Sequence, residues 1–340
     1  MAFLYRERMG LACGRGNLDI FWMRCMILKK IRNQIRRVIN RFSPEIGYFK
    51  YVQHTGQQAS DIIREKLLND DPAMICRFGS NELDCLCHYL DHMRLEKWWR
   101  SVGVGRGSLR EIIWDDIILR NMHLNAGVFP PTPEILARFS QRMLEDVKQI
   151  DILGSWMKKE KKVFPYMRDP AFVMLHDLEP FRHASPWSAA LRGKRVLVVH
   201  PFEKSIKSQY ARHSKLFANN EILPDFELVT LKAVQSIAGD KPDFDTWFEA
   251  LAFMENRISS MRFDIALIGC GAYGLPLAAH VKRMGKKAVH VGGALQLMFG
   301  IIGARWDNPA FSGMFNEYWV HPLEEERPRD SSSIEGGCYW

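Results

Sequence analysis

The stretch between Gly193 and Val291 alternates short apolar runs with segments of helical periodicity, and this alternation constrains the fold most. Unbroken apolar runs are typical of parallel strands that are buried on both faces. We therefore predict an α/β fold with a doubly wound, mostly parallel sheet and right-handed crossovers. The expected strands are 195–200, 226–229, 263–268 and 287–291, with helices at 203–218, 243–261 and 275–284.

The N-terminal half gives a weaker version of the same pattern. Apolar runs predict strands at 73–78 and 150–153 and a possible short strand at 172–175. Ser60 is expected to cap a helix over 61–68, Thr132 and Pro133 to begin one that runs to about Gln149, and a helix is expected over 80–90. The stretch 93–131 gives no clear pattern.

The positive charge of the chain is concentrated at its start. The net charge is +8, and residues 1–45 account for +7 of it, with ten basic and three acidic side chains. The remaining 295 residues are therefore almost neutral, which argues against nucleic acid as a partner. We expect three parts: a basic segment 1–50, an α/β domain 51–320 (with an N-terminal part 51–192 and a nucleotide-binding part 193–320) and a polar, frayed tail 321–340.

Residues 20–42 have the pattern of a basic amphipathic helix. Ile27, Ile31, Ile35, Val38 and Phe42 recur on one helical face, and lysine and arginine fill much of the rest. Such a helix can lie on an anionic membrane surface, or it can pack on the body of the protein. Seven cysteines without a C-x-x-C pair favour a reducing compartment. We expect a cytoplasmic protein, with possible peripheral contact at the inner face of the membrane.

A glycine-rich turn follows the strand expected at 263–268. Gly269, Gly271 and Gly274 fit G-x-G-x-x-G between a strand and a helix, and Tyr273 lies within the motif. Such glycines let a phosphate approach the backbone near a helix N-terminus. The next strand ends without the acid that a dinucleotide requires, so a nicotinamide or flavin cofactor is disfavoured. The glycines could instead serve only a tight turn.

Three other strand ends carry candidate binding groups. His200, Lys204 and Ser205 follow the strand 195–200, where a lysine and a helix N-terminus could hold an anion. Arg77 to Glu82 follow the strand 73–78, and the Glu82 carboxylate could bind a metal–diphosphate, act as a base or merely cap its helix. The last strand is followed by candidate ligand-contacting residues Gly292, Gly293, Gln296 and Arg305.

These turns together resemble a known family. R-x-G-x-x-E at 77–82, F-D-I-A-L-I-G-C-G-A-Y-G-L-P at 263–276 and V-G-G-A-L-Q-L-M-F-G-I-I-G-A-R-W at 291–306 are similar to motifs of the GT-D fold glycosyltransferases. More closely, they resemble the GT-D-like domain proteins of bacterial surface-polysaccharide loci. The resemblance covers about 55–320 and implies a Rossmann-like fold.

The resemblance also implies a reaction. The family transfers a sugar from a nucleotide-diphosphate sugar to a glycan, glycolipid or glycoprotein acceptor, with a divalent cation (Mn²⁺ or Mg²⁺). Its first turn usually reads R-x-G-D-G-E, whereas Ser80 stands here at the aspartate position and Glu82 at the glutamate position. From the residues and the resemblance together, we expect Glu82, Arg77 and His200 to be catalytic, with Glu82 also the expected metal ligand. The other candidates would contact the nucleotide sugar: Gly79, Ser80, Asn81, Lys204, Ser205, Gly269, Gly271, Tyr273, Gly274, Gly292, Gly293, Gln296 and Arg305.

Two other classes of function remain open at this stage. The replacement of the aspartate by Ser80 suits a catalytically inactive binding or scaffold protein in a polysaccharide-assembly complex. A methyltransferase or an oxidoreductase could use the same glycine turn, although the missing strand-end acid counts against both.

Overall fold

The computed structural model describes residues 51–101, 114–240, 242–309, 311–328, 330–331 and 337–340. These residues belong to the larger of the chain's two units, Tyr48–Trp340. The basic helix expected at 20–42 lies outside the described residues. The boundaries expected for the domains therefore stay a prediction.

The described residues form a parallel sheet of seven strands in the order β3-β2-β1-β7-β6-β4-β5. This arrangement confirms the predicted doubly wound α/β fold. The strands are β1 (Ala73–Cys76), β2 (Ile152–Ser155), β3 (Ala171–Met174), β4 (Arg195–His200), β5 (Glu227–Lys232), β6 (Ile265–Ile268) and β7 (Lys287–His290).

Alternate residues of each strand enter two separate cores, one on each face of the sheet. In β4, Leu197 and Val199 belong to one core, while Val196 and Val198 belong to the other. All four are buried, as the unbroken apolar run predicts for a strand covered on both sides.

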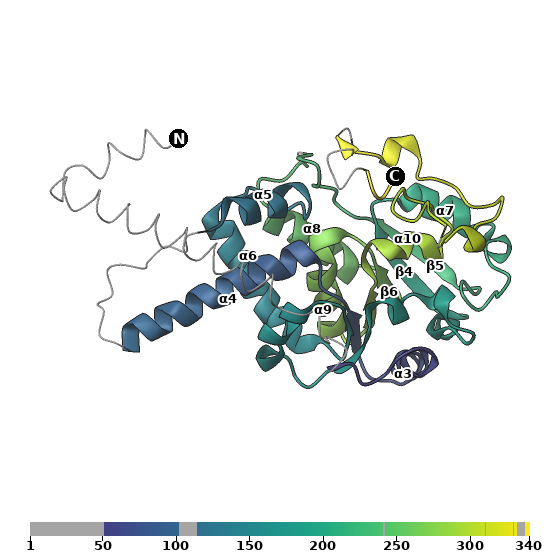
Figure 1. The fold of residues 1–340 in the computed structure, drawn as a ribbon. Helices are drawn as coiled ribbons and strands as arrows, with labels where there is room; N and C mark the ends of the chain where they lie inside the picture. The colour runs from purple at the N-terminus through teal and green to yellow at the C-terminus, as the bar shows by residue number, and fades with distance from the viewer. Residues whose placement is uncertain (1–50, 102–113, 241, 310, 329, 332–336) are drawn as a thin grey trace. The chain divides into compact units, whose positions relative to one another are not determined.

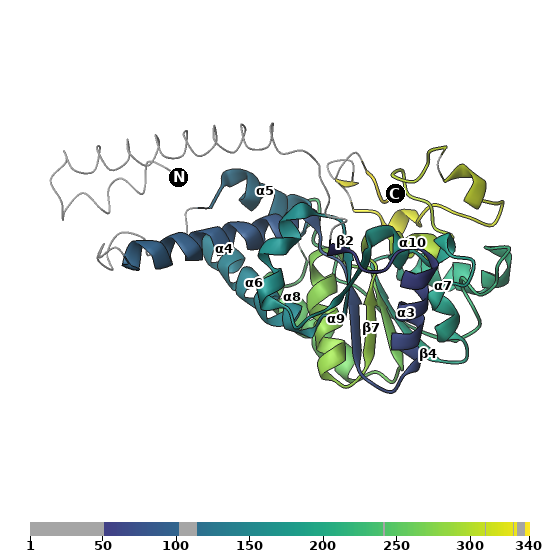
Figure 2. The same cartoon turned by 60° about the horizontal axis from the view of Figure 1, so that its bottom comes forward.

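Helices cover both faces of the sheet, and together with it they make three layers. Figure 2 shows α4, α6, α8 and α9 on one side and α3 and α7 on the other. The helices are α3 (Gln57–Leu68), α4 (Ser80–Ser101), α5 (Asp116–Leu124), α6 (Pro133–Asp146), α7 (Glu203–Tyr210), α8 (Trp247–Ser259), α9 (Gly274–Arg283) and α10 (Leu295–Met298). Figure 1 shows the order of these elements along the chain.

The helix ends differ from the sequence expectation in several places. Thr132 caps α6 as predicted, since its side chain accepts a hydrogen bond from the Ile135 N–H at 3.3 Å. Ser60 is not a cap: α3 begins earlier, and the buried Ser60 hydroxyl donates to the Ser185 carbonyl at 2.9 Å. Thr246, rather than a residue near Asp243, caps α8.

Two further bounds differ, and both concern helix length. The helix that starts at Glu203 ends at Tyr210 rather than near 218, and the one that starts at Ser80 continues to Ser101 rather than ending near Leu90. The stretch 93–131, which gave no clear pattern, contains α5.

The chain end is packed rather than frayed. Cys338 and Trp340 are buried, and the backbone N–H groups of Arg305 and Ala304 donate to their carbonyl oxygens at 2.9 and 3.2 Å. The Trp340 ring also meets the Phe202 ring edge-on at 6.0 Å. The expectation of a frayed tail is therefore wrong for the described residues, because two aromatic side chains at its end offset the polar composition of 321–340.

Candidate functional site

The sheet has a topological switch point between β4 and β6. These strands are neighbours, but the chain leaves β4 through α7 towards β5 and leaves β6 through α9 towards β7 on the other side. The two connections diverge, so a crevice opens beyond the carboxyl ends of the strands, where ligands of open α/β sheets bind. A pocket of about 380 Å³ lies at this edge.

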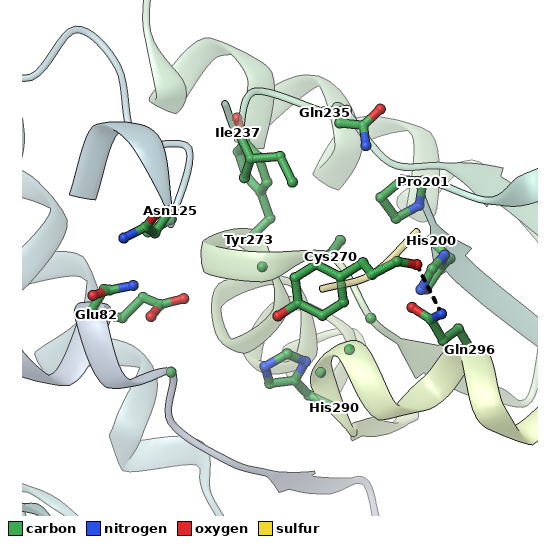
Figure 3. Close-up of a pocket in the computed structure, with 18 of the residues that line it drawn as sticks. Glu82, Asn125, His200, Pro201, Gln235, Ile237, Cys270, Tyr273, His290 and Gln296 are labelled. Atoms are coloured by element: carbon green, nitrogen blue, oxygen red, sulfur yellow. Dashed lines mark hydrogen bonds between the residues drawn. The ribbon is translucent and has the colours of Figure 1, made fainter. Parts of the chain in front are cut away.

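Most of the candidate residues line this one pocket. They come from the segments that follow β1, β4, β6 and β7, as expected for strand ends that meet at the same edge of a parallel sheet (Figure 3). The candidates in the lining are Arg77, Gly79, Ser80, Asn81, Glu82, His200, Gly269, Gly271, Tyr273, Gly292, Gly293, Gln296 and Arg305. Lys204, Ser205 and Gly274 are outside it.

The charged side chains of the lining are Arg77, Glu82 and Arg305. The Arg77 guanidinium lies 5.2 Å from the centre of the Trp156 ring, and burial lowers its pKa while the Glu82 carboxylate counteracts the shift. The Arg305 guanidinium lies 4.8 Å from the centre of the Tyr339 ring. The two cations destabilise each other, since Arg305 also lowers the pKa of Arg77. An anion bound between them would relieve this repulsion.

Gly79 and Gly292 leave room for these side chains. A Cβ atom at Gly79 would overlap the Glu82 carboxylate, so only glycine lets Glu82 fold back over the turn. Gly292 has a φ of +72°, and a Cβ there would lie 3.3 Å from Cδ of Arg77. Both glycines therefore help to set the positions of the charged groups.

Neutral polar groups gather at another part of the pocket. Figure 3 shows Gln235, His200 and Gln296 on one side and Glu82 and Asn125 on the other. His200 Nδ1 accepts the Phe202 N–H at 3.0 Å, so the proton of the neutral ring is on Nε2. Burial lowers the pKa of His200 to about 3 and keeps the ring neutral.

Two amide atoms in this region lack a partner among the described residues. Gln296 Nε2 donates to the carbonyl oxygens of Ile301 and Tyr339 at 3.3 and 3.1 Å, which leaves its Oε1 buried and unpaired. Nε2 of Gln235 is also buried and unpaired. Buried unpaired polar groups cost free energy, and in a pocket lining they are candidate ligand contacts.

The three glycines of the 269–274 motif do different things. Gly271 has a φ of +55°, and a Cβ there would lie 3.9 Å from the Ala126 carbonyl oxygen, so the turn is uncrowded at this position. Gly269 is crowded, because its Cβ would lie 2.8 Å from both the Gly292 carbonyl oxygen and Cδ2 of His200. Gly274 does not line the pocket; a Cβ there would overlap the ring of His290. Gly274 therefore makes room for the His290 ring, and the pocket lining does not support its predicted contact with the nucleotide.

The start of α7, where Lys204 and Ser205 lie, also differs from the expectation. The Glu326 carboxylate is buried at the start of α7, where it accepts the Lys204 N–H at 2.7 Å and hydrogen bonds from both the backbone and the hydroxyl of Ser205. The Lys204 ammonium pairs with Glu325 at 2.8 Å. The Glu326 carboxylate thus occupies the helix N-terminus that was expected to hold the diphosphate. Both anions favour the same N–H groups.

Sequence reasoning missed several lining residues. Asn125, Trp156, Gln235, Cys270, His290, Tyr339 and Trp340 all line the pocket. His290 could have been predicted, because it ends a buried strand, as His200 does. The others belong to loops or to the chain end, whose position only the folded structure gives.

The residues present do not form a protein-held metal centre. Glu82 is the single acidic side chain in the pocket lining, and among the described residues no group of three His, Cys, Asp or Glu side chains is arranged to hold a metal. Mg²⁺ can be held by one carboxylate together with substrate phosphates, but then most of its ligands come from outside the protein. The cationic groups of the lining are the guanidinium groups of Arg77 and Arg305.

Comparisons with known proteins add little. No family model matches the chain, and no curated protein matches it. One solved structure, described as a selenomethionine-substituted structure of domain of unknown function 1792 (DUF1792), aligns with 81% of this chain and 93% of its own. The identity is 11% and the TM-score 0.34. In the described part of the chain, no helix combines the length and the apolar character needed to cross a membrane.

Proposed function

We propose that the chain is a glycosyltransferase that binds a nucleotide-diphosphate sugar in the pocket at the switch point. The sugar would pass to a glycan, glycolipid or glycoprotein acceptor in the synthesis of a bacterial surface polysaccharide. The observation that carries the proposal is the meeting of Arg77 and Arg305 in one pocket, although 228 residues separate them in the chain. The resemblance of the motifs at 77–82, 263–276 and 291–306 supports the same reaction.

The diphosphate would lie against the two arginines. Departure of a nucleoside diphosphate leaves negative charge on its phosphate oxygens, and preorganised cations stabilise that charge in the transition state. Arg77 and Arg305 are held in place by Trp156 and Tyr339, respectively. Their repulsion in the ligand-free protein favours an anionic ligand over a neutral one.

The nucleoside would lie in the part of the pocket that contains Gln235, His200 and Gln296. These side chains are uncharged. The Nε2–H of His200 and the Gln296 oxygen have no hydrogen-bond partner among the described residues, so they offer one donor and one acceptor. Tyr273, Tyr339 and Trp340 also line the pocket and supply the apolar area that a sugar or a base requires.

Glu82 would either bind the metal or contact a sugar hydroxyl. The expected divalent cation stays a prediction, since its ligands would come mainly from the phosphates. The contact of 20–42 with the inner face of the membrane, which would bring the enzyme near a lipid-linked acceptor, likewise stays a prediction.

Isothermal titration with uridine diphosphate, guanosine diphosphate and thymidine diphosphate tests the proposal. We expect micromolar to millimolar binding of at least one of them to the wild-type protein, and weaker binding to Arg305→Met. Each titration is repeated with Mg²⁺, with Mn²⁺ and with a chelator, and binding in the chelator is expected because the arginines carry the countercharge. Absence of binding of all three at millimolar concentration would overturn the proposal.

A second candidate function is a binding protein without catalysis, favoured by Ser80 at the family's aspartate position and by the single acidic group in the lining. Glu82→Gln separates the two in the producing bacterium. Loss of the surface polysaccharide in this variant indicates an enzyme, whereas an unchanged polysaccharide indicates a binding protein.

A further inference from the structure

His290 is a buried histidine that the proposed function leaves without a task. It is the last residue of β7, between β1 and β6 at the centre of the sheet, and its side chain lines the pocket. Figure 3 shows the ring at the lower edge of the pocket, with Glu82 to its left. Its register places it beside Ile268 of β6.

The hydrogen bonds of the ring define its tautomer. Nδ1 lies 3.1 Å from the carbonyl oxygen of Ile268, which can only accept, so Nδ1 carries the proton. In the neutral ring, Nε2 then has a free lone pair. Within the described part of the chain, no hydrogen bond to Nε2 is formed. The ring therefore presents an unused acceptor at the pocket.

Packing holds the ring in this orientation. The ring lies against Gly274, and any Cβ atom at that position would overlap it. The last glycine of the 269–274 motif thus makes room for an imidazole. A side chain fixed by both a hydrogen bond and a tight contact is preorganised, as a catalytic group must be.

From this arrangement we infer that His290 is a catalytic residue, the base that takes the proton from the acceptor hydroxyl. The inference rests on the proposed function. The hydroxyl proton moves to Nε2, and the hydroxyl oxygen forms a bond to the anomeric carbon of the donor sugar. The bond from that carbon to the diphosphate breaks, and its electron pair leaves with the diphosphate, which Arg77 and Arg305 stabilise. A single displacement of this kind inverts the anomeric configuration.

Binding of the donor would change the charges around His290. Burial first, and then the Arg77 charge, lower the pKa of His290 to about 3 in the free protein. The other titratable groups in the lining are Glu82, Arg305, His200, Cys270, Tyr273 and Tyr339, and Cys76 ends the neighbouring strand β1. A bound diphosphate would offset Arg77, so the imidazolium that forms during transfer would be stabilised.

Glu82 has another part in the pocket, because its carboxylate stabilises the Arg77 charge.

The test uses the full-length protein and the nucleoside diphosphate that binds in the titrations, with its sugar conjugates as donors. We expect His290→Ala to bind this diphosphate within about threefold of the wild type but to transfer sugar at least 100-fold more slowly, within the range for a lost general base. Added imidazole should restore part of the rate. His176→Ala, which removes an exposed histidine outside the lining, is the control and should neither slow nor respond to imidazole.

A second measurement is independent of turnover. Nitrogen NMR of the ¹⁵N-histidine-labelled free protein should show His290 as the Nδ1–H tautomer, with His290→Ala used for assignment. A proton on Nε2 would overturn the inference, as would unchanged turnover in His290→Ala or a bound donor that the wild type never turns over. Absence of nucleoside-diphosphate binding would instead overturn the proposed function and, with it, the reaction assigned to His290.

Discussion

The imidazole of His290 rests on the backbone of Gly274, sixteen residues earlier in the chain, and no other amino acid at 274 leaves space for it. This contact links the glycine motif at 269–274 to the end of the next strand. We predict that Gly274→Ala displaces the ring and lowers stability by about 1–3 kcal/mol, the usual cost of overpacking. Urea unfolding measures the change. Gly313→Ala, at a position with open space and an ordinary φ, is the control and should stay within about 0.5 kcal/mol of the wild type.

The two arginines of the lining should dominate diphosphate binding. Arg77→Met and Arg305→Met should each weaken the affinity for the bound nucleoside diphosphate at least tenfold, about 1.4 kcal/mol, because each removes a charge-assisted contact. Titration calorimetry measures this. Lys204→Met removes a cation of similar size outside the pocket and should change the affinity less than twofold. A larger effect at Lys204 than at Arg305 would place the diphosphate at the start of α7.

Glu326 should matter for stability. Its carboxylate satisfies the backbone N–H groups at the start of α7 and the Ser205 hydroxyl, so Glu326→Ala leaves buried donors unpaired. We predict a loss of about 1–3 kcal/mol in the free energy of unfolding. Glu324→Ala, which removes an exposed carboxylate on the same short helix, should cost less than about 0.5 kcal/mol. Equal losses in the two variants would contradict the capping role.

The buried histidines predict how stability depends on pH. Burial lowers the pKa of His200 and His290 to about 3 in the folded protein, against 6.5 for an ordinary histidine. Below about pH 6.5 the unfolded chain therefore binds protons that the folded chain does not, so stability falls as the pH drops from about 6.5 towards 3. Each histidine should contribute up to about 1.4 kcal/mol per pH unit.

Comparison of the wild type with His200→Gln isolates this effect, because acidic groups shift stability in both proteins alike. Urea unfolding at pH 7, 6 and 5 should give a shallower decline for His200→Gln. Parallel declines would mean that His200 is protonated, or exposed, in the folded protein.

Much of the fold could be predicted from the sequence because the relevant interactions are local. The strand at 195–200 and the helix start at Thr132 and Pro133 were found from apolar runs and capping chemistry. Helix ends such as Tyr210 were missed, because local propensity does not determine where a helix stops. The crossover rules predicted only the class of fold. The strand order and the register came from the structure.

The site could be predicted where it follows strand ends, since parallel strands place their carboxyl ends at one edge. Arg77, Glu82, His200 and Gly271 were found in this way. The contribution of Tyr339 and Trp340 could not be found, because it depends on a distant segment that returns to Gly293 and Gly303. The occupation of the start of α7 by Glu326 was missed for the same reason, since 121 residues separate Glu326 from Ser205.

A crystal structure of the protein with its nucleoside diphosphate tests the central claim most directly. The account predicts a diphosphate between the guanidinium groups of Arg77 and Arg305, with the nucleoside beside His200 and Gln296 and with Glu326 still bound to α7. A diphosphate that displaces Glu326 from the start of α7, or that binds outside the pocket at the switch point, would contradict it.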